Sequence, residues 1–335
     1  VLASNDQRCR EALATTPNIF LYHKRGAELP ILPVTPSGAK LFLRRIGHAR
    51  IPPQSVARLA DVLASGSRRV AIHAEDEARM NARADLRVEG DPSSHPVWRD
   101  DESAILATRR ILALARAAGR RIHVLHITTP AELELLSQHK DIASCEVTPQ
   151  HLTLAAEEAY PRLGSFAQMN PPIRSAAHRD GLWHWLRQGV PDVIGSDHAP
   201  HTREEKAKPY PASPSGMPGV QTLLPLMLTH VAAGRMTLER LVDMLSYGPQ
   251  RLFNLRAKGR IAVGYDADFS IVDLEKRWTI NEDWLASRCG WSPFTGMEMV
   301  GQPVGTIIRG QRVMWEGQLA DRATGRPFRF EDTAL

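Results

Sequence analysis

The sequence is poor in cysteine and contains no long apolar run. Its 335 residues include three cysteines, Cys9, Cys145 and Cys289, with no Cys-x-x-Cys pair. This excludes a disulfide scaffold, disfavours a thiolate zinc site, and is typical of reduced thiols in the cytosol. No apolar stretch approaches the roughly 20 residues that cross a bilayer, and no secretory signal is visible. We therefore expect a cytoplasmic protein that does not engage a membrane.

The net positive charge is confined to one end of the chain. Lys and Arg number 42 and Asp and Glu 37, which gives a formal charge of +5. Residues 1–70 contain eleven basic and four acidic side chains, so the remaining residues are slightly acidic overall. This uneven distribution disfavours a nucleic-acid-binding protein. A hydrophobic content of 43% with 24% charged residues is typical of a globular protein and excludes wholesale disorder.

Strand and helix patterns alternate from about residue 68 to residue 247. Short apolar runs such as 69–73 and 121–127 alternate with stretches such as 102–118, whose apolar residues recur at helical spacing. This alternation predicts a parallel sheet with helical crossovers. After Gly248, short strands with glycine turns predict a small all-β appendage. The expected divisions are an irregular, proline-broken segment over 1–66, an α/β domain over 67–254, and a C-terminal β portion with a tail over 255–335.

Three polar residues close predicted strands. His73 and His126 end apolar runs, and Asp197 ends the run that begins at Asp192. The carboxyl ends of parallel barrel strands meet on one face, so these groups are expected to converge. Imidazole and carboxylate ligands favour a zinc-like divalent ion at a catalytic site with an open position. His123 lies three residues before His126, and strand alternation directs it to the opposite side.

His95 is different, because it lies in a Ser-Ser-His-Pro segment. We expect it to be a loop residue with no catalytic role.

Several motifs occur in a fixed order along residues 67–320. They are His73-Ala-Glu-Asp, His126-Ile-Thr, Glu146-Val-Thr-Pro, Met169-Asn-Pro-Pro-Ile-Arg174, Ser196-Asp-His-Ala-Pro-His-Thr-Arg-Glu-Glu-Lys206 and Gly216-Met-Pro-Gly-Val-Gln-Thr222. This order resembles that of the dihydroorotases, which are cyclic amidohydrolases of the amidohydrolase superfamily. The string that begins at Ser196 is the most specific element, because related hydantoinases, dihydropyrimidinases and allantoinases usually differ after Asp-His.

The resemblance implies an α/β fold, a TIM-like (β/α)8 metallo-dependent hydrolase barrel with a small β-sandwich appendage. It implies reversible opening of dihydroorotate to N-carbamoyl-aspartate in pyrimidine biosynthesis. His73 and His126 resemble ligands of one metal, and Asp197 resembles a ligand that also acts as the general acid and base. Lys40 resembles the lysine that is carbamylated in many relatives to bridge two metals. A plain surface lysine is an equal alternative for Lys40.

The resemblance also assigns substrate contacts. Asn170 and His201 resemble side chains that contact the substrate, and the backbone near Pro218 and Gly219 resembles the part that lines the ring.

The family's opening motif is absent. Relatives begin the barrel with His-x-His-x-Arg, which supplies two metal ligands and an arginine for the substrate carboxylate, but no His-x-His occurs in this chain. Gln150 also occupies a position where many relatives carry His. We therefore expect an N-terminally incomplete barrel that lacks its first strand or strands. Such a half-site should bind metal and an anionic substrate weakly and show little activity by itself.

Three hypotheses follow. The first is a dihydroorotase-type enzyme with one or two divalent ions, zinc above all, a small-molecule substrate and a homo-oligomeric state. The second is a non-catalytic dihydroorotase-like subunit that scaffolds aspartate carbamoyltransferase, which the missing His-x-His favours. The third is a dihydropyrimidinase or allantoinase, which the sequence Ala199-Pro-His201 disfavours.

Overall fold

The computed structural model describes residues 40–42, 59–60, 62–64, 66–321, 325–326 and 330. The irregular segment expected over 1–66 therefore lies almost wholly outside the described residues, and so does the side chain of Lys40. Within the described part, no helix is both long enough and apolar enough to cross a bilayer.

Five short strands form a parallel sheet, and their order in space follows their order in the sequence. Each strand pairs in parallel with the next. Those from β2 to β5 are buried along their whole length, as expected for parallel strands that are covered on both faces. The strands are β1 (Lys40–Phe42), β2 (Val70–His73), β3 (Ile122–Val124), β4 (Ala143–Val147) and β5 (Val193–Ile194).

The strand order distinguishes a barrel from an open doubly wound sheet. A doubly wound sheet reverses its strand order at a switch point, whereas the strands of a (β/α)8 barrel follow one another around the barrel. From β1 to β5 the order runs without reversal. The described strands are thus arranged as part of a barrel, with their carboxyl ends at one edge.

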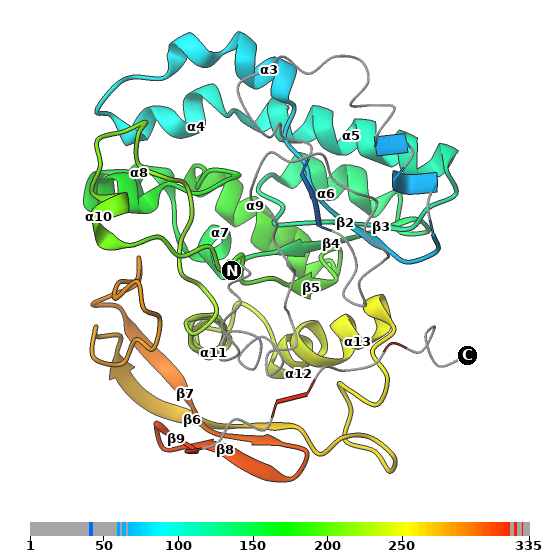
Figure 1. Ribbon diagram of the computed structural model, residues 1–335, viewed down its shortest axis with the longest axis vertical. Coiled ribbons are helices and arrows are strands. Elements are labelled where there is room, and N and C mark those ends of the chain that lie inside the picture. Colours follow the sequence, from blue (N-terminus) through cyan, green and yellow to red (C-terminus); the bar gives the residue numbers. More distant parts are fainter. Residues whose placement is uncertain are drawn as a thin grey trace.

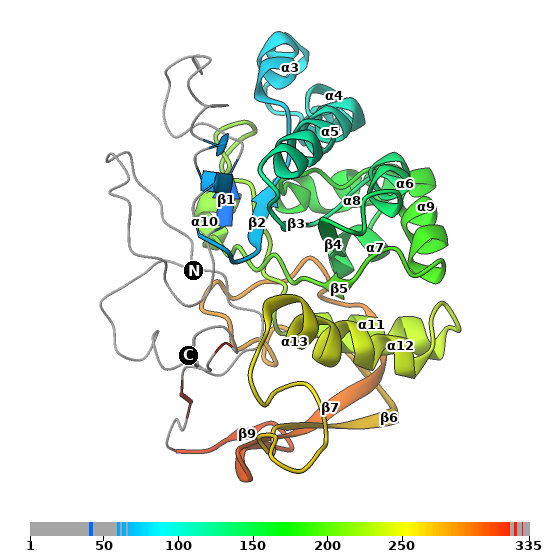
Figure 2. The same cartoon turned by 90° about the vertical axis from the view of Figure 1, so that its right-hand side faces the viewer.

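Helices cover the parallel strands. Figure 2 shows α5, α6 and α9 together on one side of them. The side chain of Asp100 caps the N-terminus of α5. The buried face of this helix includes Ala104, Ile111 and Ala115. The helices are α3 (Glu77–Ala82), α4 (His95–Trp98), α5 (Asp101–Ala117), α6 (Pro130–Ser137), α7 (Pro149–Thr153), α8 (Ala156–Leu163), α9 (Ala176–Arg187), α10 (Arg203–Lys206), α11 (Leu223–Ala232), α12 (Leu238–Val242) and α13 (Gly248–Phe253), with 3-10 turns η1 (Ala84–Leu86), η2 (Pro92–Ser94) and η3 (Gly164–Ala167) and a π-helical turn η4 (Asp243–Tyr247).

A separate antiparallel sheet follows the helices in the sequence. Its strands β6 (Phe269–Thr279), β7 (Glu298–Ile308), β8 (Gln311–Trp315) and β9 (Gln318–Leu319) pair in that order. Arg309 and Gly310 connect β7 to β8, and both have positive φ, 47° and 77°, as a two-residue hairpin turn that matches strand twist requires. Figure 1 shows α11, α12 and α13 between this sheet and β5.

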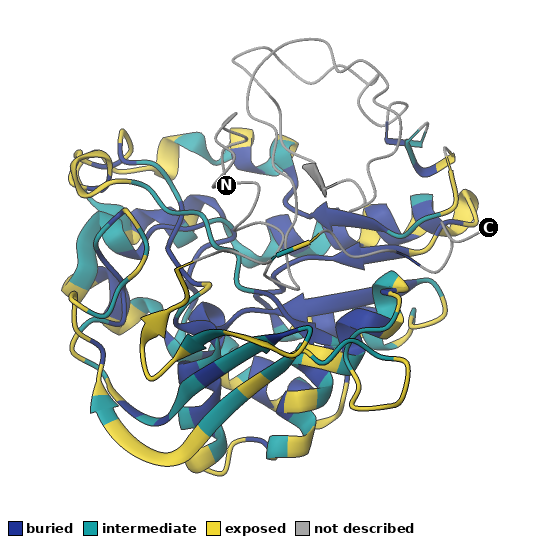
Figure 3. Ribbon diagram, turned by 60° about the horizontal axis from the view of Figure 1, so that its bottom comes forward, coloured by how far each residue is buried: buried dark blue, intermediate teal, exposed yellow. Residues whose placement is uncertain are grey.

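The largest apolar core lies between the parallel strands and their covering helices. Ile72, Val124 and Val147 from the strands are packed with Ile111 and Leu133 from the helices, and each is at most 1% exposed. In Figure 3 the parallel strands are buried, whereas the antiparallel sheet is mostly intermediate or exposed. The strands that carry the strand-end residues are thus held in this buried apolar core.

Candidate active site

Each of the three predicted strand-end residues lies at the carboxyl end of a parallel strand. His73 is the last residue of β2, His126 follows β3 by two residues, and Asp197 follows β5 by three. Because these strands are parallel members of one sheet, the three residues lie at the same edge.

His73 and His126 form a buried imidazole pair. Nδ1 of His73 lies 3.0 Å from Nε2 of His126, and the rings meet edge to face with centroids 4.8 Å apart. Both residues are 2% exposed. Two nitrogens on one tetrahedral zinc, with bonds of about 2.0–2.1 Å, lie about 3.3 Å apart. The spacing of the two rings therefore suits two ligands of a single ion.

Glu75 and Arg99 hold His73 in place. Nε2 of His73 lies 2.8 Å from Oε2 of Glu75, and Arg99 pairs with both oxygens of that carboxylate. Burial opposes ionisation of Glu75, but Arg99 and His73 outweigh it and hold the pKa of that carboxyl below its usual range. An ionised Glu75 accepts the proton on Nε2, so Nδ1 of His73 presents a lone pair towards His126.

This arrangement is the one that metal-ligating histidines commonly show, in which the second ring nitrogen donates to a carboxylate. No other cluster completes the site: the described residues contain no group of three or more His, Cys, Asp or Glu placed to hold a metal ion.

His126 and Asp197 share an unusual backbone conformation. Their φ angles are 37° and 38°, in the left-handed region that non-glycine residues rarely adopt. Such conformations concentrate at functional sites because the surrounding structure must enforce them. The structure thus turns the chain sharply after β3 and after β5, at two of the predicted positions.

Lys40 can be placed only by its backbone. It belongs to β1, where Lys40 pairs with Ala71 and Phe42 with His73, so it lies two residues before the level of His73. The predicted carbamylation and metal bridging concern a side chain outside the described residues and remain a prediction.

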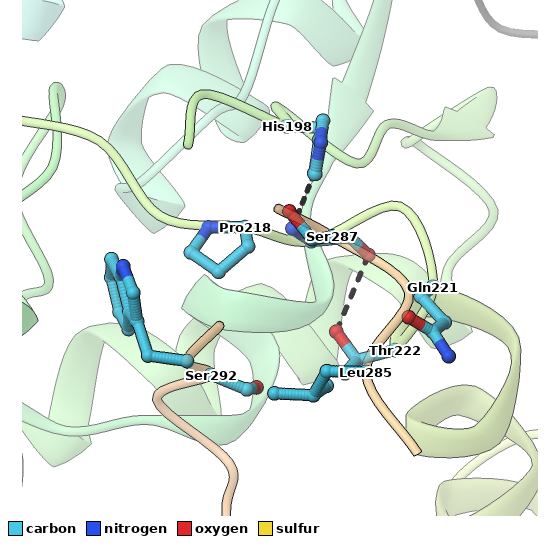
Figure 4. A pocket seen from close by; sticks show the side chains of 9 residues that line it. His198, Pro218, Gln221, Thr222, Leu285, Ser287 and Ser292 are labelled. Atoms are coloured by element: carbon cyan, nitrogen blue, oxygen red, sulfur yellow. Dashed lines mark hydrogen bonds between the residues drawn. The ribbon is translucent and has the colours of Figure 1, made fainter. Parts of the chain in front are cut away.

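Pro218 and Gly219 are buried in a turn that His198 holds. Nδ1 of His198 accepts from the backbone N–H groups of Gly219, at 3.0 Å, and Val220, at 3.3 Å. Two donors on Nδ1 require a neutral ring with its proton on Nε2, in agreement with burial, which lowers the pKa of His198 to about 4. Figure 4 shows this contact beside Pro218.

The hollow that these residues line is small. Its volume is about 10 Å³, which is room for about one water molecule, so this turn alone does not form a substrate-sized pocket. A larger hollow of about 410 Å³ is lined by residues of α5, α6 and the segment after them, including Arg109, Leu112 and His139, and by none of the predicted site residues.

A side chain at position 219 would not fit. A Cβ on Gly219 would meet Nε2 of Gln150 at 2.4 Å and the carbonyl oxygen of Ser196 at 2.5 Å. Gln150 donates from that same Nε2 to the Ser196 oxygen at 2.8 Å. Its Oε1 is buried without a hydrogen-bond partner among the described residues. The glycine thus allows the turn to approach the end of β5 closely.

Asn170 and His201 occupy separate loops. Oδ1 of Asn170 lies 3.0 Å from Nε2 of His95. Nδ1 of His201 lies 3.2 Å from Glu205, and its carbonyl accepts from the indole of Trp291. The roles of Asn170 and His201 towards substrate remain predictions.

The expectation for His95 as a loop residue is wrong. His95 begins helix α4 and is 2% exposed, because the proline after it suits a helix start and its ring is enclosed by Trp98 and Tyr210. His123 is buried and contacts Ser144 and Glu146.

Sequence reasoning did not assign roles to Glu75, Arg99 or His198. Glu75 follows His73 by two residues, in the loop just after β2, and a carboxylate so near a candidate metal-ligating histidine was a usable signal. Arg99 lies 24 residues further along, and no local pattern links it to Glu75.

Parallel strands in barrel order, with histidines and an aspartate at their carboxyl ends, define a barrel of the (β/α)8 type with a polar carboxyl edge. The amidohydrolase family model matches residues 52–313, and the chain belongs to that family. Its superfamily is metal-dependent, which agrees with the paired imidazoles. The prediction of a TIM-like barrel fold with a separate β appendage is confirmed.

Known relatives carry two kinds of name. A dihydroorotase of Halobacterium salinarum is 39% identical over 260 residues, which cover 78% of this chain and 60% of that protein. An L-hydantoinase of Paenarthrobacter aurescens is 35% identical over 265 residues, 75% of this chain and 57% of that protein. The solved structure of an L-hydantoinase (dihydropyrimidinase) from Arthrobacter aurescens superposes with a TM-score of 0.79 at 30% identity, over 87% of this chain and 68% of that one. The chain thus spans about 60% of the length of these curated relatives.

Proposed function

We propose that this chain belongs to a dihydroorotase-type hydrolase, which reversibly opens the cyclic amide of dihydroorotate to N-carbamoyl-aspartate in pyrimidine biosynthesis. The observation that carries the proposal is the pair His73–His126, with nitrogens 3.0 Å apart and Glu75 behind them. It occurs at a barrel edge in a chain 39% identical to a dihydroorotase. The resemblance of the Ser196–Lys206 segment to dihydroorotases favours this substrate over other cyclic amides.

Zinc is the proposed ion, at one or two positions. His73 Nδ1 and His126 Nε2 would hold it, with Asp197 and a carbamylated Lys40 as further ligands. When bound, a divalent ion would lower the pKa of water towards neutrality and polarise the ring carbonyl. An imidazole pair suits zinc better than magnesium or calcium, which prefer oxygen ligands.

Asp197 is the proposed general acid and base. Its carboxylate would take the proton from the attacking water and deliver it to the amide nitrogen as the ring C–N bond breaks. The left-handed backbone at Asp197 places this residue at the turn after β5, beside the segment that His198 fixes. Asn170, His201 and the backbone at Pro218 and Gly219 are the proposed contacts to the small-molecule substrate.

The decisive experiment compares wild type with Asp197→Asn. Purified protein is loaded with zinc, and ring opening is assayed on dihydroorotate and on dihydrouracil. Turnover of dihydroorotate by wild type should be slow, because the His-x-His ligands are absent from this chain. We expect even this slow turnover to disappear in the variant while most of the metal is retained, since two imidazoles remain. Activity of Asp197→Asn close to that of wild type would overturn the assignment.

Two observations favour alternative functions, and the same assay distinguishes them. The 35% identity to an L-hydantoinase favours a different cyclic amide, and preferential turnover of dihydrouracil would support it. The absence of His-x-His from the sequence favours a scaffold for aspartate carbamoyltransferase. Absence of metal and turnover, with that enzyme bound to the chain, would support the scaffold. A homo-oligomeric state is expected in either case.

A further inference from the structure

Asn170 is the accessible member of an otherwise buried segment. Residues 167–169 and 171–174 are all buried, whereas Asn170 is partly exposed. Its side-chain oxygen nevertheless faces the buried ring of His95 at 3.0 Å. One branch of this amide is thus committed to the protein interior, and the other carries the amino group.

The direction of each hydrogen bond around His95 is determined. Nε2 of His95 lies 3.1 Å from the carbonyl oxygen of Met169, and a carbonyl accepts only, so Nε2 carries the proton. The amide atom that shares this proton must then be the oxygen of Asn170. A flipped amide would set two donors against each other.

The far side of the ring is fixed in the same way. Trp98 donates from Nε1 to the hydroxyl of Tyr210 at 2.6 Å, and indole is a donor only. The Tyr210 hydroxyl is thereby oriented to donate to Nδ1 of His95, which lies 3.2 Å away. Burial lowers the pKa of His95 to about 3, so the ring stays neutral with its proton on Nε2 throughout the neutral pH range.

We propose that His95 is a positioning residue, which locks the amide of Asn170 so that its amino group is presented to an acceptor oxygen of the substrate. This rests on the proposed function and deepens it. The site would prefer a ligand with a carbonyl or carboxylate oxygen at this point and reject one with a donor there, because a buried donor facing a donor is costly.

The test measures dissociation constants of dihydroorotate and N-carbamoyl-aspartate by ligand-observed NMR, which reaches the millimolar range. Four variants are compared with wild type: His95→Phe, His95→Gln, Asn170→Ala and the double variant of His95→Phe with Asn170→Ala. Phe keeps an aromatic ring without either nitrogen, whereas Gln retains an amide donor near the position of Nε2. Zinc content and apo melting temperature are recorded for each protein.

If His95 acts through Asn170, His95→Phe and Asn170→Ala each weaken binding about tenfold, and the double variant is no weaker than Asn170→Ala alone. His95→Gln recovers at least part of the affinity, and zinc content does not change. Additive losses in the double variant, or wild-type affinity in His95→Phe, would overturn the inference while leaving the proposed function intact. A wild-type protein that binds neither compound overturns both.

Discussion

Two buried hydrogen bonds decide which nitrogen of His73 faces His126. Glu75 accepts from one ring nitrogen, and Arg99 keeps that carboxylate ionised at 0% exposure. Replacing either member would leave a buried charge without compensation, which costs about 3–5 kcal/mol in comparable pairs. At the scale of single residues, the metal half-site therefore depends on a carboxylate that touches no proposed ion.

Substitution of Glu75 by Gln should weaken zinc binding about 10- to 100-fold, the range seen when a carboxylate behind a metal-ligating histidine is lost. Zinc titration by calorimetry measures the effect. Glu134→Gln, on the exposed face of α6, is the matched control and should bind zinc as wild type does. Equal affinity in both variants would show that Glu75 does not position His73.

Gly219 tests the close approach of the turn to β5. A Cβ there would lie 2.5 Å from the Ser196 oxygen, so Gly219→Ala should displace the turn, cost about 1–3 kcal/mol of stability and weaken substrate binding. Gly119→Ala is the control. That residue has φ of 62° and nothing within 4 Å of its Cβ, so it should lose about 1 kcal/mol and keep substrate affinity. Undiminished ligand binding by Gly219→Ala would contradict the assigned turn.

Three helices that follow strand-end loops begin at threonine caps. Thr129 starts α6 and Thr148 starts α7, and each accepts a backbone N–H in its first turn. Thr202 starts α10 in the same way. A cap satisfies donors that would otherwise be unpaired. At the scale of elements, the caps fix where each helix begins and therefore how the loop before it leaves the strand.

The two capping boxes should differ in their effect on stability. Thr129 pairs with the buried Glu132, which Thr108 also contacts at 3.0 Å, whereas Thr202 pairs with the exposed Glu205. Thr129→Ala should lower the free energy of unfolding by about 2 kcal/mol and Thr202→Ala by well under 1 kcal/mol. Urea titration of the two variants measures the difference, and equal losses would argue against a structural role for the buried box.

Elements were predictable where the pattern is local. The helix expected over 102–118 is α5 at Asp101–Ala117, and the glycine turns expected after Gly248 include the β7–β8 turn at Gly310, because periodicity and glycine turns act over a few residues. The network of His95, Tyr210 and Asn170 was not predictable. Its members are 75 and 115 residues apart, and only tertiary packing brings them together.

At the scale of the whole molecule, four buried or partly buried histidines from different parts of the fold are neutral at neutral pH. Burial lowers the pKa of His95 to about 3 and the pKa values of His151, His198 and His230 to about 4. In the unfolded chain each has a pKa near 6.5. Below pH 6.5 the unfolded state therefore binds protons that the folded state does not. The stability that depends on these neutral histidines is fully present above pH 6.5 and is lost as pH falls towards 4.

The free energy of unfolding should consequently decrease between pH 6.5 and pH 4, by up to about 1.4 kcal/mol per pH unit for each of these groups. Urea unfolding at pH 7.5, 6 and 5 measures the slope. His230→Gln should reduce the proton uptake on unfolding by about one proton, because it removes one of the four groups. A stability that is flat from pH 7.5 to pH 5 would contradict this account.

The central claim is that His73 and His126 hold a divalent ion, and equilibrium dialysis against zinc tests it most directly. The comparison is wild type, His126→Asn, and His139→Asn as a control in the turn after α6, with folding checked by circular dichroism. We predict that wild type and the control bind at least one zinc ion per chain and that His126→Asn loses that ion. Equal zinc binding by all three proteins would contradict the claim.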